Sequence, residues 1–193
     1  MRLIGANSEQ FLEFGLDDNN LVIEGEETNR IRSAIFSPDG EFIVTTGSAG
    51  SSSPEIWDVQ RRRLLRRLPE HNGPVNSVAV SEDNQFVLSA SDDFSVILSA
   101  VASGDEIRSY NAHQNRVTMA IFTDADERVI SASSDGTMYL WDKLPISRSV
   151  QALEGHGAGV DTIAQLPYDP DFFLSTSATG ELSLWNGISG TLV

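Results

Sequence analysis

One histidine, one serine and one aspartate in the middle of the chain have the side chains of a hydrolytic triad. His113, Ser131 and Asp135 could act as base, nucleophile and orienting carboxylate if folding brought them within hydrogen-bonding distance. An enzyme gains little from copying a catalytic centre, and these residue types are copied, which argues against catalysis. The copies, at matching intervals, are His71, Ser89 and Asp93, and then His156 and Ser175.

A tryptophan that follows the serine predicts a structural role instead. The indole N–H of Trp141 can only donate, and a buried indole needs an acceptor. The Ser131 hydroxyl can accept from it and donate onward to His113, whose second ring nitrogen can meet the Asp135 carboxylate. We therefore predict no catalytic residue in the chain. The predicted structural hydrogen-bond network comprises His113, Ser131, Asp135 and Trp141, then His71, Ser89 and Asp93, and finally His156, Ser175 and Trp185.

The chain consists of copies of one unit about 42 residues long. Trp57 and Ser99 are 42 residues apart, Ser99 and Trp141 are again 42 apart, and Trp141 and Trp185 are 44 apart. An interval of this length indicates a supersecondary unit that is repeated head to tail. A side chain that recurs on this interval is expected to serve the unit itself.

Each copy is expected to contain four short strands joined by tight turns. The runs 75–80 and 117–122 are predicted as innermost strands, and 86–90 and 128–132 as the strands that follow them, because β-branched and apolar residues dominate. Short connections make the four strands an antiparallel meander. Within one repeat region over 1–193, the expected units are a partial blade at 1–28 and blades at 29–70, 71–112, 113–155 and 156–193, the last with a truncated fourth strand.

This pattern resembles the WD-repeat family. In the best copy, Ala112-His113, Ser131, Asp135-Gly136 and Trp141-Asp142 stand at the family's Gly-His, Ser, Asp and Trp-Asp landmarks, with Ala112 in place of Gly. The resemblance implies an all-β fold, a β-propeller of four-stranded antiparallel blades. The family most often closes with about seven blades, and just under five are present here, so we expect an incomplete or open ring. Exposed blade faces at its ends would favour self-association.

The charge of the chain argues against nucleic acid as a partner. The formal net charge is −15 and the sequence pI is about 4.4, whereas nucleic-acid binding depends on neutralising phosphates with Lys and Arg. One local exception gathers five of the thirteen basic residues at positions 61, 62, 63, 66 and 67. We interpret this segment as a solvated outer strand whose charges protect an exposed edge, with an acidic docking partner as the alternative.

The residue types also restrict the compartment and the chemistry. The chain has no Cys, which excludes disulfides and Cys-ligated metal centres, and it has no apolar run of the roughly 20 residues that a membrane span requires. We expect a cytoplasmic protein, or a nuclear one if the source has a nucleus. The three His lie on equivalent positions of different blades, too far apart for one metal site. We therefore expect no cofactor and no metal.

The loops that carry the histidines and aspartates should emerge on one side of the propeller, near its axis. The resemblance implies that partners dock on this side, through residues just after each innermost strand begins and just before each aspartate. Aromatic anchors typical of binding hot spots are not expected among them. The candidate partner-binding residues are Arg32, Asn76, Asp92, Arg116, Thr118, Ser134, Asp161 and Ala178.

The predicted function is that of a scaffold or adaptor module that binds a protein or peptide partner through this loop side. Two alternatives of another class stay open. The chain could be part of a larger multidomain enzyme, such as a kinase or a nucleotide-switch protein, or it could be a propeller hydrolase. A non-repeating cluster of carboxylates or histidines facing the axis would favour the hydrolase, and the sequence contains none.

Overall fold

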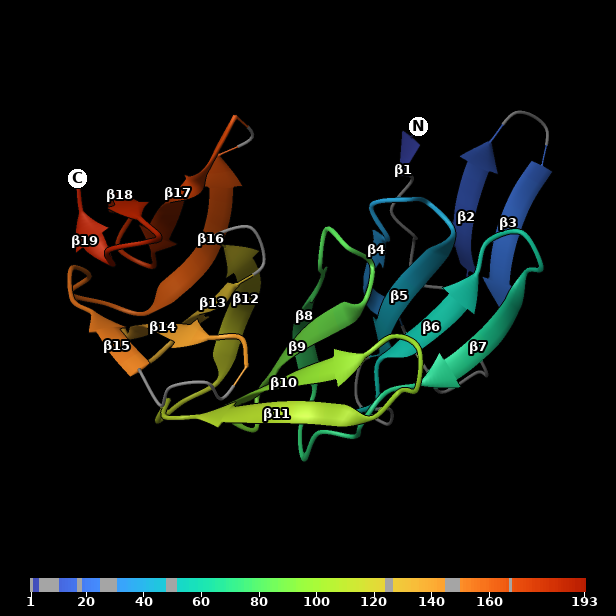
Figure 1. The fold of residues 1–193 in the computed structure, drawn as a ribbon, viewed down its shortest axis with the longest axis horizontal. Coiled ribbons are helices and arrows are strands. Elements are labelled where there is room, and N and C mark those ends of the chain that lie inside the picture. The colour runs from blue at the N-terminus through green and yellow to red at the C-terminus, as the bar shows by residue number, and fades with distance from the viewer. Residues whose placement is uncertain are drawn as a thin grey trace.

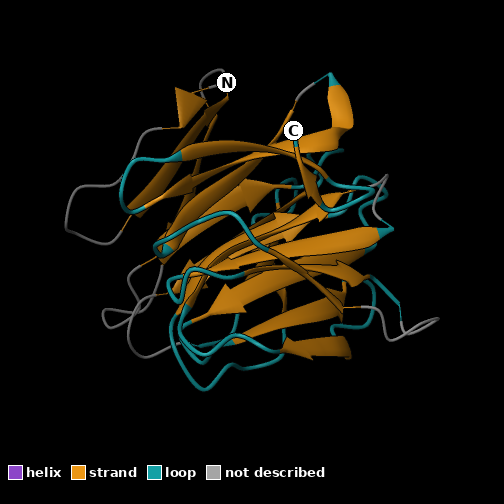
Figure 2. Ribbon diagram, turned by 90° about the vertical axis from the view of Figure 1, so that its left-hand side faces the viewer, coloured by secondary structure: helices purple, strands orange, loops and turns teal. Residues whose placement is uncertain are grey.

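All regular structure in the described part of the protein is β-strand, as the all-β prediction requires. Figure 2 shows the strands and the loops that connect them. None of the described segments is a helix of the length and hydropathy that a membrane span needs. The computed structural model describes residues 2–3, 11–16, 19–24, 31–47, 52–123, 127–144, 150–166 and 168–193.

The strands form five antiparallel sheets in chain order. Sheet 1 has three strands and sheets 2 to 5 have four strands each, and within every sheet the strands are ordered as they follow one another in the sequence. Sheet 1 contains β1 (Arg2–Leu3), β2 (Phe11–Leu16) and β3 (Asn19–Glu24). Sheet 2 contains β4 (Ile31–Phe36), β5 (Phe42–Gly47), β6 (Glu55–Asp58) and β7 (Arg63–Arg67).

The other three sheets repeat the arrangement of sheet 2. Sheet 3 contains β8 (Val75–Val80), β9 (Phe86–Ser91), β10 (Ser95–Ala100) and β11 (Glu106–Asn111). Sheet 4 contains β12 (Val117–Thr123), β13 (Arg128–Ser133), β14 (Met138–Asp142) and β15 (Val150–Leu153). Sheet 5 contains β16 (Val160–Leu166), β17 (Asp169–Ser177), β18 (Leu182–Asn186) and β19 (Thr191–Leu192). Each is the four-stranded antiparallel meander expected of a propeller blade.

The sheets follow one another along an open arc (Figure 1). The first strands of successive sheets contact each other, β4 with β8, β8 with β12 and β12 with β16, while β7 and β11 lie at the outer rim. The middle strands of the sheets inside the arc are buried on both faces, because these sheets are covered by a neighbour on either side. In β9, every residue after Phe86 is buried.

A separate hydrophobic core fills each of the three interfaces between sheets 2 and 5. Between sheets 3 and 4 it includes Leu88 and Val96 from one sheet and Val129 and Trp141 from the other. Similar cores join sheets 2 and 3 and sheets 4 and 5. Since burial of apolar surface is the main stabilising contribution to such sheets, each sheet depends on its neighbours for stability.

The outer face of sheet 5 differs from the faces inside the arc. Leu182 is 66% exposed, whereas Met138, which stands at the position of Leu182 in sheet 4, is 1% exposed. The difference arises because sheet 5 packs against Met138 in sheet 4, whereas no described residue covers Leu182 in the same way. Self-association through this face stays a prediction.

Candidate functional site

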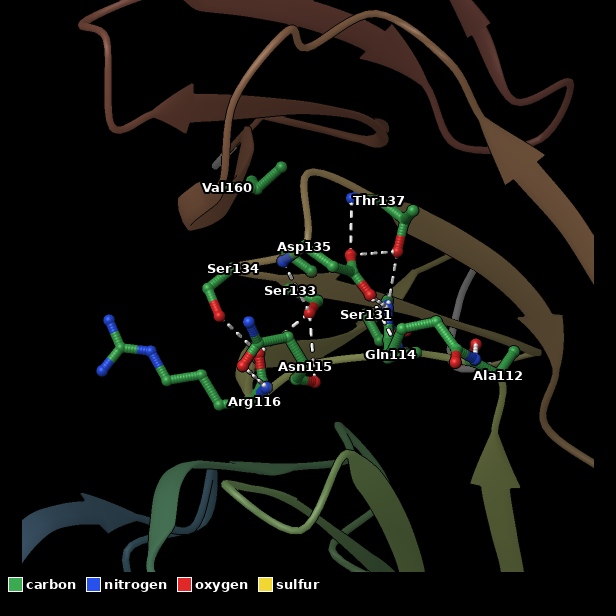
Figure 3. Close-up of polar contacts among 12 residues, drawn as sticks. Ala112, Gln114, Asn115, Arg116, Ser131, Ser133, Ser134, Asp135, Thr137 and Val160 are labelled. Atoms are coloured by element: carbon green, nitrogen blue, oxygen red, sulfur yellow. Dashed lines mark hydrogen bonds and ion pairs between the residues drawn. The ribbon is translucent and has the colours of Figure 1, made fainter.

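The hydrogen-bonded network in sheet 4 links a strand, a turn and a loop. The Trp141 indole N–H donates to the Ser131 hydroxyl at 2.9 Å, and that hydroxyl lies 2.7 Å from Nε2 of His113. On its other side, Nδ1 of His113 lies 2.8 Å from the Thr137 hydroxyl, which donates to Asp135 at 2.6 Å. Figure 3 shows Asp135, Thr137 and the neighbouring loop.

The proton positions in this network follow from its two ends. Trp141 can only donate and the ionised Asp135 carboxylate can only accept. Thr137 therefore donates to Asp135 and accepts from Nδ1–H of His113, so Nε2 is unprotonated and accepts from Ser131. All four bonds run in one direction, and they hold His113 in its neutral form.

One contact differs from the sequence-based expectation. The second ring nitrogen of His113 was expected to meet Asp135 directly, but the nearest carboxylate oxygen is 3.8 Å away and Thr137 lies between them in the bonding sequence. Asp135 uses its oxygens for other donors. It accepts from the backbone N–H of Thr137 at 2.8 Å and of Gln114 at 2.7 Å, so it ties the turn after β13 to the loop that carries His113.

Sheet 3 has the same network without a tryptophan. Nε2 of His71 lies 2.8 Å from the Ser89 hydroxyl, and Nδ1 lies 3.0 Å from Asp93 and 3.1 Å from the Ser95 hydroxyl. Here the direct contact between histidine and aspartate is present. Asp93 also accepts from the backbone N–H of Asn72 at 2.8 Å, which repeats the link between turn and loop.

Sheet 5 keeps the tryptophan side of the network and loses the aspartate side. The Trp185 indole N–H donates to Ser175 at 2.7 Å, and Ser175 lies 2.6 Å from Nε2 of His156. Nδ1 of His156 is buried and has no hydrogen-bond partner among the described residues. The nearest carboxylate there, at 3.6 Å, belongs to Glu181, because Thr179 stands in the aspartate position.

Sheet 2 retains a single bond of the network. The Trp57 indole N–H donates to the Thr45 hydroxyl at 2.9 Å. Glu27, which stands at the histidine position, lies outside the described residues. The contribution of the network therefore varies from sheet to sheet, and it is fullest in sheets 3 and 4.

Burial perturbs the titration of the two histidines whose networks include an aspartate. It lowers the pKa of His113 to about 4, against a weaker opposing effect of Asp135. Burial also lowers the pKa of His71, although the charge and hydrogen bond of Asp93 offset part of the effect. For Asp135, burial raises the pKa, but hydrogen bonds from Thr137 and Gln114 outweigh it and the net pKa is below the ordinary value.

This arrangement fits a structural role better than catalysis. Ser131 has no exposed surface and His113 is 5% exposed, so a substrate has no access to the hydroxyl. The Ser131 oxygen is also engaged by two partners, Trp141 and His113. What the arrangement does is satisfy buried polar groups while it fixes a loop to a turn at one end of each sheet.

That end of the sheets is called the loop face here. In sheets 3 to 5 it consists of loops 71–74, 112–116 and 154–159 and turns 91–95, 133–137 and 177–181. The loops and turns are in close contact. A Cβ atom added to Gly73, for example, would lie 3.0 Å from the backbone nitrogen of Asp93.

Two of the candidate partner-binding residues on or beside the loop face bridge neighbouring sheets. The Asn76 amide donates to Asp92 at 2.7 Å and to the Val117 carbonyl of the next sheet at 2.8 Å. The Thr118 hydroxyl likewise donates to the Val160 carbonyl of sheet 5 at 2.8 Å. These side chains are partly buried, and their donors are already used.

The remaining candidate residues differ in how far they are available to a partner. Arg32, Arg116, Asp161 and Ala178 are exposed. Ser134 is partly buried, and its hydroxyl donates to the Arg116 carbonyl at 3.3 Å. The Arg116 side chain points away from the network in Figure 3, and it is exposed.

A further residue on the loop face, Phe94, was missed by the sequence analysis, which expected no aromatic anchor there. Phe94 is 45% exposed and has φ of +73°. The equivalent turn positions of sheets 4 and 5 are Gly136 and Gly180, with φ of +87° and +84°. A bulky residue is rare in this left-handed region. The signal was present in the sequence, because alignment of the copies places Phe94 in a glycine position.

Comparison with known proteins agrees with the repeat assignment. The chain matches the family described as "WD domain, G-beta repeat" over residues 19–58, 62–98, 104–142 and 147–186. Each matched segment starts with the outermost strand of one sheet and continues through the three inner strands of the next. The segment 62–98, for example, runs from β7 into β10.

Individual relatives match over most of the chain but only part of their own length. COMPASS component SWD3 of Saccharomyces cerevisiae is 26% identical over 158 residues, which are 81% of this chain and 49% of that protein. The U5 small nuclear ribonucleoprotein 40 kDa protein of Dictyostelium discoideum is 29% identical over 141 residues, 72% of this chain and 39% of that protein. The chain thus spans about half or less of the length of these relatives.

A solved structure has the same architecture. A chain in the crystal structure of a mitotic checkpoint complex superposes with a TM-score of 0.76 and 21% sequence identity, over 91% of this chain and 53% of that chain. At this identity the likeness shows the fold alone. Together with the four matched repeats and the four four-stranded sheets, it places the chain among the propellers, and the chain belongs to the WD-repeat family.

Proposed function

We propose that this chain is a non-catalytic interaction module that binds a protein or peptide partner on its loop face. The observation that carries the proposal is Phe94, an exposed aromatic side chain on a left-handed backbone position that glycine occupies in sheets 4 and 5. Strained backbone positions cluster at functional sites, and aromatic side chains dominate binding hot spots. Exposed charges of both signs are present on the loop-face side of other sheets, at Arg32, Arg116 and Asp161.

The relatives give this proposal independent support. SWD3 is named as a component of COMPASS, and the superposed structure is that of a mitotic checkpoint complex. These names describe proteins that work inside larger assemblies. Rigid sheets that hold variable loops are suited to such work, because stability and recognition depend on different residues.

Affinity capture with the full chain and two variants tests the proposal. Phe94→Gly should fold at least as stably as the parent, since glycine relieves the left-handed strain, yet it should lose most of the captured partner. The charge-neutral exchange Arg116→Glu with Asp161→Lys should weaken capture as well, because it reverses two exposed charges on the same face.

Matched controls separate a local effect from a general one. Ile107→Ala shortens an apolar side chain that is 41% exposed but lies on the outer strand β11, and Asp105→Lys reverses a charge at the opposite end of sheet 3. Both controls should capture the partner as the parent does. Undiminished capture by Phe94→Gly and by the charge exchange would refute the proposed face.

A further inference from the structure

A compact positive surface lies at the outer edge of an otherwise acidic protein. Residues 61–67, called the arginine rim here, hold five of the thirteen basic residues, while the chain has 28 acidic ones. They occupy the turn before β7 and β7 itself, the last strand of sheet 2. The other outermost strands with described side chains, β11, β15 and β19, contain one arginine between them, Arg108.

Three of the five arginines have structural partners. Arg61 bonds to Asp58 at 2.8 Å and Arg67 bonds to Glu55 at 2.9 Å. Arg66 lies against the next sheet, where a Cβ atom on Gly104 would approach its Cδ to 3.3 Å. Local pairing and packing therefore account for these three side chains.

Arg62 and Arg63 are different. Both are exposed, and neither has an ion pair or a side-chain hydrogen bond to any residue that the structure describes. Arg66 also has no ion pair to a described residue, but it is partly buried against the next sheet, so the exposed part of the surplus positive charge belongs to Arg62 and Arg63.

The backbone at Arg62 adds an independent observation. Arg62 has φ of +51°, in the left-handed region that disfavours residues with a side chain. The equivalent turn residues in sheets 3 and 5 are Gly104 and Gly190, with φ of +82° and +68°. An arginine thus occupies a turn position that favours glycine, and its guanidinium has no described partner inside the protein that would explain its presence there.

The strand beside these arginines is built to avoid pairing with another strand. Five residues of β7 oppose four of β6, with the register shift between Ile56 and Trp57, so Leu65 is an extra, bulged residue. Its side chain is 40% exposed. Bulges and charges on an edge strand prevent continued main-chain pairing. Recognition at the arginine rim therefore has to use side chains.

We propose that the arginine rim is a second docking surface, separate from the loop face, and that it binds an acidic segment of a protein partner. Arg62 and Arg63 would bind its carboxylates, and Leu65 would contact an apolar side chain between them. A short acidic protein segment fits better than nucleic acid, because the positive surface is only one short strand long, whereas nucleic-acid binding depends on many phosphate contacts along the backbone.

Fluorescence anisotropy with a labelled decaglutamate peptide tests this inference. The parent should bind the peptide at low salt and release it as salt is raised, since exposed ion pairs are screened. Arg62→Gly with Arg63→Gln should raise the Kd about tenfold, at about threefold for each exposed pair. The same variant should keep or raise the thermal unfolding midpoint, because glycine fits the left-handed turn.

A charge-matched control and a second probe make the outcome decisive. Arg32→Gln with Arg116→Gln removes two exposed charges from the loop-face side and should leave the Kd for the peptide within about twofold of the parent value. An equal increase of the Kd in this control, or an unchanged Kd in the rim variant, would overturn the inference. Tighter binding of a labelled ten-nucleotide oligothymidylate, lost in the rim variant, would also overturn it by assigning the surface to nucleic acid.

Discussion

A carboxylate oxygen of Glu181 lies 3.6 Å from the buried Nδ1 atom of His156. In sheets 3 and 4 the equivalent nitrogen lies 3.1 Å and 2.8 Å from a serine or threonine hydroxyl. Sheet 5 has the hydroxyl and the carboxylate in exchanged positions, as Thr179 and Glu181, where sheet 4 has Asp135 and Thr137. The exchange leaves the histidine without the acceptor that its neighbours have.

Restoring the sheet 4 order in sheet 5 should stabilise the protein. The double variant Thr179→Asp with Glu181→Thr offers His156 a hydroxyl backed by a carboxylate, and we expect the free energy of unfolding to rise by about 1 kcal/mol. Urea denaturation monitored by tryptophan fluorescence measures the change. Glu181→Thr alone should give a smaller gain, and a double variant less stable than the parent would contradict the assigned network.

Removal of the indole donor in sheet 4 should destabilise the fold without affecting recognition. Trp141→Phe leaves Ser131 without its donor and opens space in the core shared with Tyr110 and Val129, so we expect a loss of about 2 kcal/mol. Differential scanning calorimetry measures this loss. Trp57→Phe should cost less, because Trp57 is only partly buried. Complete loss of partner capture by a folded Trp141→Phe protein would argue against a purely structural role.

Acid should destabilise the protein before its carboxylates titrate. The pKa of His113 falls from 6.5 in the unfolded chain to about 4 in the folded protein, so below pH 6.5 the unfolded state takes up a proton that the folded state refuses. Stability is therefore complete above pH 6.5 and falls as pH drops toward 4, by roughly 3 kcal/mol for this residue. His71, whose pKa is also lowered, adds a loss of the same sign.

Urea titrations at several pH values measure this dependence. His113→Gln cannot take up the proton, so its stability should fall less steeply than that of the parent between pH 6.5 and 4. The variant is expected to be less stable than the parent at pH 7, because the network is intact only in the parent. The informative quantity is therefore the slope of the free energy of unfolding against pH. A parent whose stability is constant over this interval would contradict the neutral, buried assignment of His113.

The exposed outer face of sheet 5 should make the isolated chain self-associate. Leu182 on this face is 66% exposed, and apolar sheet faces of this kind favour association. Light scattering should report a mass that increases with concentration, and Leu182→Lys should shift it toward the monomer. Ile107→Lys, on the outer strand β11, should leave the mass unchanged. A parent that stays monomeric at all concentrations would refute this prediction.

The repeat interval was sufficient to predict most of the fold. The strands expected at 75–80 and 86–90 are β8 and β9 with at most one residue added, because turns and apolar runs recur at fixed places in every copy. The Trp141, Ser131 and His113 contacts also lie where donor and acceptor properties suggested. Periodic residues are predictable because each copy has to satisfy the same buried groups.

The deviations between copies were harder to predict. Nδ1 of His113 is 2.8 Å from the Thr137 hydroxyl and 3.8 Å from the Asp135 carboxylate. Residue types alone do not specify which of the two groups lies nearer. Asn76 and Thr118 were predicted as candidate partner-binding residues, but their donors reach carbonyls of the adjacent sheet, and packing between sheets is not encoded in a strand pattern. Phe94 and Arg62 could have been found, since each replaces a glycine of the repeat.

The offset between sequence repeat and sheet has a consequence for how such a chain tolerates rearrangement. A matched repeat such as 62–98 supplies β7 to sheet 2 and β8 to β10 to sheet 3. Excision of one matched repeat would therefore pair the third strand of one sheet with the outermost strand of the next, β6 with β11, whereas excision of one whole sheet, β8 to β11, would leave every remaining strand with its own partners. A deletion of equal length that began between β8 and β9 would instead join an innermost strand to a foreign partner. Gain or loss of a unit is thus expected to preserve all strand pairs only when the boundaries of the unit lie between two sheets.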